Sequence, residues 1–225
     1  ASEIFAGAIQ DYRRGIVIGD HSTHGKGTVQ QLYDLDNMLL ALGNRGPKMG
    51  ALKLTIQQFY RPGGDSTQNR GVQPDIRLPS AISPEEVGES SRDGALPWNR
   101  IRPAPFKREG SLAPLIADLQ SHDEHRIARD PGCQHGLEEI ASIDAMRKQQ
   151  SVSLNLEQRR IERETLTKDQ LDRENERRAA LGVATLDDAE DIKDVPDAIL
   201  SEALQITADL SQIEPRYVAR ARPAS

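Results

Sequence analysis

A lysine between two glycines is the first feature of this sequence that could do chemistry. The segment from Gly19 to Gly27 reads Gly-Asp-His-Ser-Thr-His-Gly-Lys-Gly and follows a short run of β-branched residues. A phosphate-binding P-loop has four residues between its glycines and a hydroxyl after its lysine, whereas here five residues separate Gly19 from Gly25 and Gly27 follows the lysine. The next residues continue as a strand, so the helix N-terminus that would hold a phosphate is missing. We therefore set nucleotide binding aside.

The lysine in this segment, Lys26, is a candidate general base. Glycines on both sides would let the backbone pack closely against a neighbouring strand, which could bury the lysine. A free lysine has a pKa near 10.4, and lowering it by roughly three units takes about 4 kcal/mol of desolvation or repulsion by positive neighbours. Only a pocket that excludes water lowers the pKa of a lysine this far. Gly-Lys-Gly taken alone is usually a surface turn, so the assignment depends on its surroundings.

The surrounding elements alternate between helix and strand over the first 80 residues. The patterns predict a helix over residues 3–14, strands over 16–18, 28–32 and 51–60, and an edge strand over 72–78. In the third strand Leu52, Leu54 and Ile56 alternate with polar residues, which is the period of a half-buried strand. An edge position would tolerate Pro74. We expect an α/β or α+β portion, a helix plus a mixed β-sheet, that positions Lys26.

Helical patterns dominate the second half of the chain. Residues 81–111 are rich in proline, serine, glycine and acids, and we expect a linker held in place by Trp98. Beyond it, apolar side chains recur at helical spacing, and the expected helices span residues 112–129, 134–149 and 195–213. Pro131 and Gly132 separate the first two. We therefore expect a mostly α-helical domain over residues 112–225.

The longest charged run of the chain covers residues 157–178. Its apolar side chains are five residues apart: Leu156, Ile161, Leu166 and Leu171. A step of five rotates each successive side chain by about 140° around a helix, so no apolar stripe forms. A solvated helix held by pairs such as Glu174 with Arg178 is the favoured interpretation, and a clasp that binds a partner is the alternative.

Composition excludes several classes of protein. The net charge is -6, with 35 acidic against 29 basic residues, so no excess of cations is present to bind nucleic acid. No apolar stretch approaches the roughly 20 residues of a transmembrane helix. The single Cys133 excludes an internal disulfide and a cysteine-based zinc cluster. The sequence lacks a start methionine and a signal-peptide pattern, and we interpret it as a fragment.

The remaining candidate residues have simpler explanations than chemistry. Asp20, His21 and His24 have a spacing that could bind a metal, but a polar loop beside an active-site turn is the commoner arrangement. Cys133 follows Pro131 and Gly132 in an expected loop, with no identifiable base to activate it. His122 and His125 lie three apart on a charged helix, where solvent exposure is the default. We expect no metal and no cofactor.

Four segments, in order and spacing, resemble the carboxy-terminal processing, or tail-specific, serine endopeptidases of the periplasmic Gram-negative type. These segments are Ala1–Tyr12, Gly25–Gln30, Ile56–Arg61 and Gly71–Ile76. The similarity continues through Ala95–Trp98 and His125–Ala128. It implies that residues 1–80 are the C-terminal part of a Ser/Lys protease core, 81–111 a linker, and 112–225 a helical C-terminal domain.

The resemblance also implies roles for individual residues. Lys26 matches the general base of the family and Gln30 the glutamine that orients it; four positions apart on a strand, the two would face the same side. The family motif Ser-Ala-Ser-Glu places the nucleophilic serine just before Ala1, so Ser2 is not expected to replace it and would instead cap the first helix. Asp11 matches an aspartate that we expect to give support. The loop before Lys26 is one residue longer than the usual form.

By the same resemblance, the whole enzyme would act in the periplasm on proteins with apolar C-terminal tails. An adaptor protein could bind the helical domain. The alternative function is a non-catalytic regulatory or partner-binding fragment of such a protease, in which the protease portion is only a scaffold.

Overall fold

A computed structural model describes residues 1–43, 46–193 and 198–221, with the backbone alone for residues 39, 41, 198 and 214–221. The chain divides into two compact units. Unit 1 comprises Ala1–Val17, His21–Asp75 and Ile82–Ser111; unit 2 comprises Ile18–Asp20, Ile76–Ala81 and the chain from Leu112 onward. Unit 1 therefore contains residues 82–111 of the segment predicted as a linker, and the boundaries of that linker stay a prediction.

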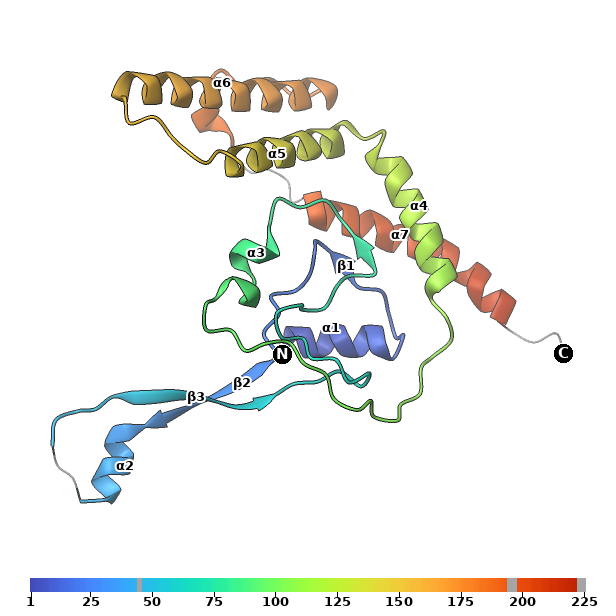
Figure 1. The fold of residues 1–225 in the computed structure, drawn as a ribbon. Coiled ribbons are helices and arrows are strands. Elements are labelled where there is room, and N and C mark those ends of the chain that lie inside the picture. The colour runs from blue at the N-terminus through green and yellow to red at the C-terminus, as the bar shows by residue number, and fades with distance from the viewer. Residues whose placement is uncertain (44–45, 194–197, 222–225) are drawn as a thin grey trace. The chain divides into compact units, whose positions relative to one another are not determined.

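Unit 1 begins with helix α1, Ser2–Asp11, close to the predicted range. The helix ends before Gly15, because Arg13 has a left-handed backbone with φ of 56°. Strands β2 (Thr28–Asp34) and β3 (Ala51–Gln58) form an antiparallel hairpin, with helix α2 (Leu35–Ala41) following β2 (Figure 1). The short helix α3 (Pro84–Val87) and the 3₁₀ turn η1 (Glu89–Ser91) complete the unit.

The expectation that β3 is half-buried is wrong. Leu52, Leu54 and Ile56 are 44–45% exposed, and seven of the eight strand residues are exposed. Within the described part of the chain no third strand extends the hairpin, and a two-stranded ribbon gives each side chain few neighbours. The alternating pattern thus predicts correctly that residues 51–58 form a strand, but it does not predict how exposed the strand is.

Unit 2 contains two short parallel strands and most of the helices. Strand β1 (Ile18–Gly19) pairs with β4 (Ile76–Arg77). The predicted edge strand over 72–78 is therefore only two residues long, and Pro74 lies outside it. The helices are α4 (Ala113–Ile127), α5 (Pro131–Arg147), α6 (Leu156–Ala180) and α7 (Ala198–Ala221), with the 3₁₀ turn η2 (Ala189–Asp191) before α7. Residues 195–197 of the predicted last helix lie outside the described residues.

The core of unit 2 lies where α4 packs against α7. Leu115 and Leu119 of α4 and Ile206 and Ile213 of α7 are at most 5% exposed. A core between two amphipathic helices is what their apolar spacing predicts.

The fold class, a helix with a mixed set of strands followed by a mostly helical domain, is confirmed.

The break predicted at Pro131 and Gly132 lies at residues 128–130, so α5 begins three residues before its predicted start. Asp130 caps α5 by accepting a hydrogen bond from the Cys133 backbone N–H at 2.8 Å, and Pro131 is the first helical residue, where its missing N–H costs nothing. The expectation that Cys133 lies in a loop is therefore wrong: it lies in the first turn of α5.

Helix α6 contains the predicted ion pair, while the choice between a solvated helix and a partner-binding clasp stays a prediction. Arg178 Nε donates to Glu174 Oε1 at 2.8 Å, and Arg177 donates to both carboxylate oxygens. The hydrogen bond from Arg177 is the main reason that the pKa of Glu174 is lowered to about 2. Glu174 itself is only 4% exposed, whereas Ile161 and Leu166 of α6 are about half exposed.

No helix in the described ranges combines the length and apolar character that a bilayer crossing requires.

Candidate active site: the lysine turn

The structure brings Lys26 and Gln30 together. Lys26 Nζ donates a hydrogen bond to Gln30 Oε1 at 3.0 Å. Lys26 is half-buried and precedes β2 by two residues, while Gln30 lies exposed in β2, just after an irregularity in the register with β3. An amide oxygen in this position fixes where the lysine nitrogen points, which is the arrangement that an orienting glutamine needs.

The backbone around Lys26, residues Thr23–Gly27, is called the lysine turn below. Gly25 has a φ of +88°, which L side chains rarely adopt. A Cβ at Gly27 would lie 2.7 Å from the Gln68 backbone nitrogen, so only glycine fits there. Gln68 Oε1 accepts the Gly27 N–H at 2.9 Å, and Asn69 N–H donates to the Gly25 carbonyl at 2.8 Å. The two glycines thus permit the close packing that their spacing predicted.

Glu3 is a residue of this site that the sequence analysis missed. It lies in the first turn of α1, and its carboxylate accepts the backbone N–H groups of Gly25 at 2.7 Å and Lys26 at 2.9 Å, together with the Thr23 hydroxyl. Glu3 therefore joins the start of α1 to the lysine turn. The signal for it was its place in the Ala-Ser-Glu motif, but no local pattern links residue 3 to residues 23–26.

Replacing Glu3 by alanine is expected to loosen the lysine turn. Hydrogen bonds to a charged group are worth about 1.5–3 kcal/mol each, and two backbone N–H groups would lose theirs. We expect amide hydrogen exchange of Gly25 and Lys26 to accelerate at least tenfold, as measured by NMR. Glu109→Ala is the control, because Glu109 is an exposed carboxylate of the same unit whose ion pair with Arg14 is 3.8 Å long. Equal protection in the Glu3 variant and wild type would contradict this role.

Asp11 forms an ion pair with Arg61 at the end of α1. Arg61 Nε donates to Asp11 Oδ2 at 2.8 Å and an Arg61 terminal nitrogen to Oδ1 at 2.7 Å. The two side chains are 11% and 19% exposed, and Gln10 Oε1 accepts from the same guanidinium at 2.8 Å. Both oxygens of Asp11 are engaged, an arrangement suited to the supporting role that remains a prediction.

The start of α1 differs from expectation at Ser2. The first helical hydrogen bond runs from the Phe5 N–H to the Ala1 carbonyl at 3.0 Å, so Ala1 takes the cap position and Ser2 is the first helical residue. The expectation that Ser2 caps the helix is wrong, because the cap position belongs to a residue that has no side-chain oxygen.

Three of the four candidate histidines, His24, His122 and His125, have ordinary partners. His24 Nε2 lies 3.2 Å from Glu89 Oε2, and His125 Nδ1 lies 2.6 Å from the Ser121 carbonyl. His122 Nδ1 lies 4.0 Å from a carboxylate oxygen of Asp209. Across the residues that the structure describes, no group of three or more His, Cys, Asp or Glu side chains converges as a metal site.

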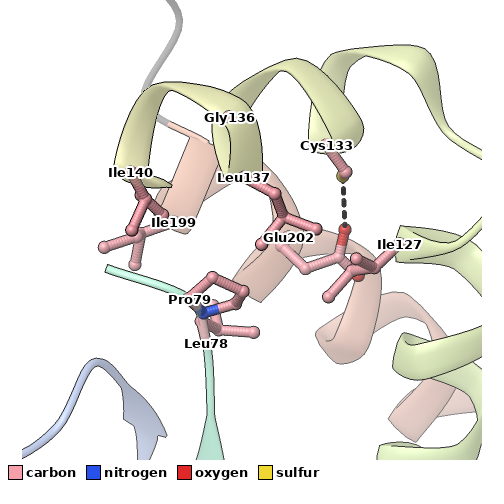
Figure 2. A pocket seen from close by; sticks show the side chains of 9 residues that line it. All are labelled: Leu78, Pro79, Ile127, Cys133, Gly136, Leu137, Ile140, Ile199 and Glu202. Carbon is pink, nitrogen blue, oxygen red and sulfur yellow. Dashed lines mark hydrogen bonds between the residues drawn. The ribbon is translucent and has the colours of Figure 1, made fainter. Parts of the chain in front are cut away.

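Cys133 lines a small apolar cavity in unit 2 (Figure 2). Its thiol points toward Glu202, with Sγ 3.9 Å from Oε2, and burial is the main reason that the pKa of Cys133 is raised to about 11. The thiol is therefore protonated at neutral pH and a poor nucleophile. The cavity holds only about 50 Å³, against roughly 300–1,000 Å³ for ligand sites.

Two family models match the chain. Residues 82–212 match the C-terminal domain of tail specific protease, and residues 1–78 match Peptidase family S41. The chain belongs to the tail-specific proteases of this peptidase family. The resemblance inferred from the sequence motifs is thereby confirmed.

Individual relatives agree with this membership. The chain is 39% identical over 221 residues to the tail-specific protease of Haemophilus influenzae, covering 93% of this chain and 30% of that protein. It is 46% identical over 140 residues to the carboxy-terminal-processing protease of Bartonella bacilliformis, covering 57% of this chain and 29% of that protein. The C-terminal processing peptidase, chloroplastic, of Tetradesmus obliquus is 30% identical over 87 residues, covering 39% of this chain and 16% of that protein. The chain thus spans about three tenths of the length of the first two relatives.

Proposed function

We propose that this chain supplies the general base and the helical C-terminal domain of a Ser/Lys serine endopeptidase. The observation that carries the proposal is the 3.0 Å hydrogen bond from Lys26 to Gln30 in a turn that Glu3 ties to the start of α1. Gln30 orients the lysine, and Asp11 supports the site through Arg61. The nucleophile is the serine that the motif Ala1-Ser2-Glu3 places immediately before Ala1.

The proposed reaction needs only these groups and water. In its neutral form, the Lys26 amine accepts the serine hydroxyl proton as the serine oxygen attacks the scissile carbonyl carbon. The resulting ammonium returns that proton to the leaving amine, and an acyl-enzyme ester remains. Water then attacks the ester carbonyl while Lys26 accepts its proton. The Lys26 ammonium passes that proton to the serine oxygen as the ester bond breaks, which restores the serine hydroxyl and the neutral lysine and releases the carboxylic acid product. The N-terminus of α1 favours the negative charge that develops on the carbonyl oxygen, since its first-turn N–H groups and dipole are positive.

Family membership and the names of the relatives support the proposed substrate class. Relatives are called tail-specific and carboxy-terminal-processing proteases, which indicates selection of proteins by their C-terminal tails. We extend this to apolar tails, to a periplasmic location, and to an adaptor protein that binds the helical domain. A lone regulatory or partner-binding fragment is the rival interpretation.

Labelling with a fluorophosphonate probe tests the position of the nucleophile. In a chain extended upstream to include the expected serine, we expect one label on that serine, located by mass spectrometry, and none on Ser2. The chain starting at Ala1 is expected to remain unlabelled and without peptidase activity, because Ser2 lies inside α1, and a displacement of even about 1 Å can cost roughly 10²-fold in rate. A label on Ser2 would place the nucleophile within this chain and overturn the register. Absence of any label in the extended chain would favour the rival interpretation.

A further inference from the structure

The segment 84–99 contacts the surroundings of Lys26 at two separate places, although it belongs to the range matched by the C-terminal domain family. One contact is at Glu89 of η1, which is 6% exposed. Its backbone N–H donates to the His24 carbonyl at 2.8 Å, and its carboxylate lies 3.2 Å from His24 Nε2. Arg92 lies 3.7 Å from the same carboxylate. Glu89 thus binds both the backbone and the side chain of the residue two positions before Lys26.

The other contact is at Trp98, which binds the loop Ser66–Arg70. The indole Nε1 donates to the Ser66 carbonyl at 2.9 Å, and the Arg70 guanidinium lies 3.7 Å from the centre of the indole ring. Neighbours of Trp98 add backbone bonds: the Ser66 N–H donates to the Asn99 carbonyl, and the Asn69 side chain donates to the Leu96 carbonyl, both at 3.1 Å. Four contacts therefore connect this short stretch to one loop.

That loop in turn holds the far side of the lysine turn. Ser66, Thr67 and Gln68 are at most 3% exposed, an unusual degree of burial for polar residues. Gln68 Oε1 accepts the Gly27 N–H, and the Asn69 N–H donates to the Gly25 carbonyl. The Thr67 hydroxyl is buried and has no hydrogen-bond partner among the described residues, so the loop carries a desolvation penalty that contacts from outside must offset.

We propose that residues 84–99 act as a positioning strap, in which Glu89 and Trp98 hold the backbone on the two sides of Lys26. The strap contributes no group to the reaction. It fixes the direction of the lysine turn, so that Nζ reaches Gln30 and the expected serine at once. The mechanical part of this inference stands on contacts within unit 1 alone, whereas its effect on catalysis rests on the proposed function of Lys26.

Amide hydrogen exchange in the chain itself tests the mechanical part. Trp98→Ala is expected to accelerate exchange of the Gly27 amide at least tenfold, because the loop that carries Gln68 loses its anchor. Trp98→Phe keeps a ring for Arg70 and removes only the bond to Ser66, so it should give a smaller acceleration in a chain that folds normally. Glu89→Ala should accelerate exchange less than Trp98→Ala, since the Glu89 backbone bond to His24 survives.

Phe106→Ala is the matched control. Phe106 is another aromatic residue of the 82–111 segment, but it packs edge-on against Tyr12, the residue that follows α1, with ring centres 5.5 Å apart. Its loss should leave Gly27 protection at the wild-type level. Unchanged Gly27 exchange in both Trp98 variants, or equal acceleration in Phe106→Ala, would overturn the strap.

Kinetics in the extended, active chain test the effect on catalysis. Trp98→Ala should lower kcat at least tenfold with little change in KM, because the strap acts on the base and not on substrate binding, and Trp98→Phe should recover part of the loss. Faster exchange at Gly27 with unchanged kcat would overturn the link from strap to catalysis. Wild-type turnover in a Lys26 variant would instead overturn the proposed function, and the exchange result would stand independently.

Discussion

Lys26→Ala is expected to lower peptide hydrolysis by a factor of about 10² to 10⁴ in the extended chain, while the fold is preserved. The methyl group of alanine cannot accept the serine proton, and the neighbouring glutamine amide is no base. The loss of packing should be small, because Lys26 is only half-buried and its hydrogen bond goes to an exposed side chain. Steady-state kinetics with a peptide substrate measure the effect, and circular dichroism verifies the fold.

Two companion variants sharpen this test. Gln30→Ala should cost less than Lys26→Ala, since the base remains and only its orientation is lost. Lys53→Ala is the matched control: Lys53 is an exposed lysine of the same hairpin, paired in register with Leu32. Near wild-type turnover in Lys26→Ala would rule out the Ser/Lys assignment, and an unchanged rate in Gln30→Ala would remove Gln30 from the site.

Unit 2 is expected to lose stability as the pH rises from about 4 to about 7. Asp123 of α4 is 3% exposed, and its Oδ1 has no hydrogen-bond partner among the described residues. The guanidinium of Arg126 binds two other carboxylates, Glu202 at 2.6 Å and Asp209 at 2.7 Å. Burial first, and then the adjacent Glu202, raise the pKa of Asp123 to about 7.

The direction of the pH effect follows from proton binding. Between pH 4 and 7 the folded chain keeps the Asp123 proton, whereas the unfolded chain, with a carboxyl pKa near 3.9, has released it. Unfolding therefore releases a proton in this range, and stability falls as pH rises until Asp123 also ionises in the folded state. At about 1.4 kcal/mol for each pKa unit, we expect a loss of about 2–4 kcal/mol.

Asp123→Asn isolates this contribution. An amide has nearly the shape of the protonated acid and cannot ionise, so the variant should be more stable than the wild type at pH 8 and should lack the decline between pH 4 and 7. Thermal unfolding followed by circular dichroism across this range gives the comparison. Glu138→Gln, an exposed carboxylate of α5, should reproduce the wild-type profile. If the stability of Asp123→Asn declines between pH 4 and 7 as much as that of the wild type, other titrating groups cause the decline.

Local patterns predicted the helices of ten residues or more, because helical spacing is a property of short segments, whereas the pairing of Lys26 with Gln30 was predicted from the family resemblance. The start of α5 was misplaced by a few residues, since proline is both a helix breaker and a favoured first residue. The exposure of β3 was missed because alternation describes the two faces of a strand but not what covers them.

The rest of the candidate site depends on contacts between residues distant in the sequence. Glu3 lies 22 residues from Gly25, and Gln68 lies 41 residues from Gly27. Neither pairing has a periodic or compositional signal. The role of Trp98 was partly predicted, as an aromatic residue that holds its segment in place, but its partner loop could not be identified without the structure.

The exposed hairpin affects how the chain behaves in solution. Leu52, Leu54 and Ile56 present an apolar surface to water, and in the described part of the chain the outer edges of β2 and β3 carry unpaired backbone groups. Such edges are templates for strand addition by a second molecule. Aggregation of the isolated chain should therefore increase with its concentration. Replacing one of these exposed apolar side chains by a charged one should reduce that aggregation.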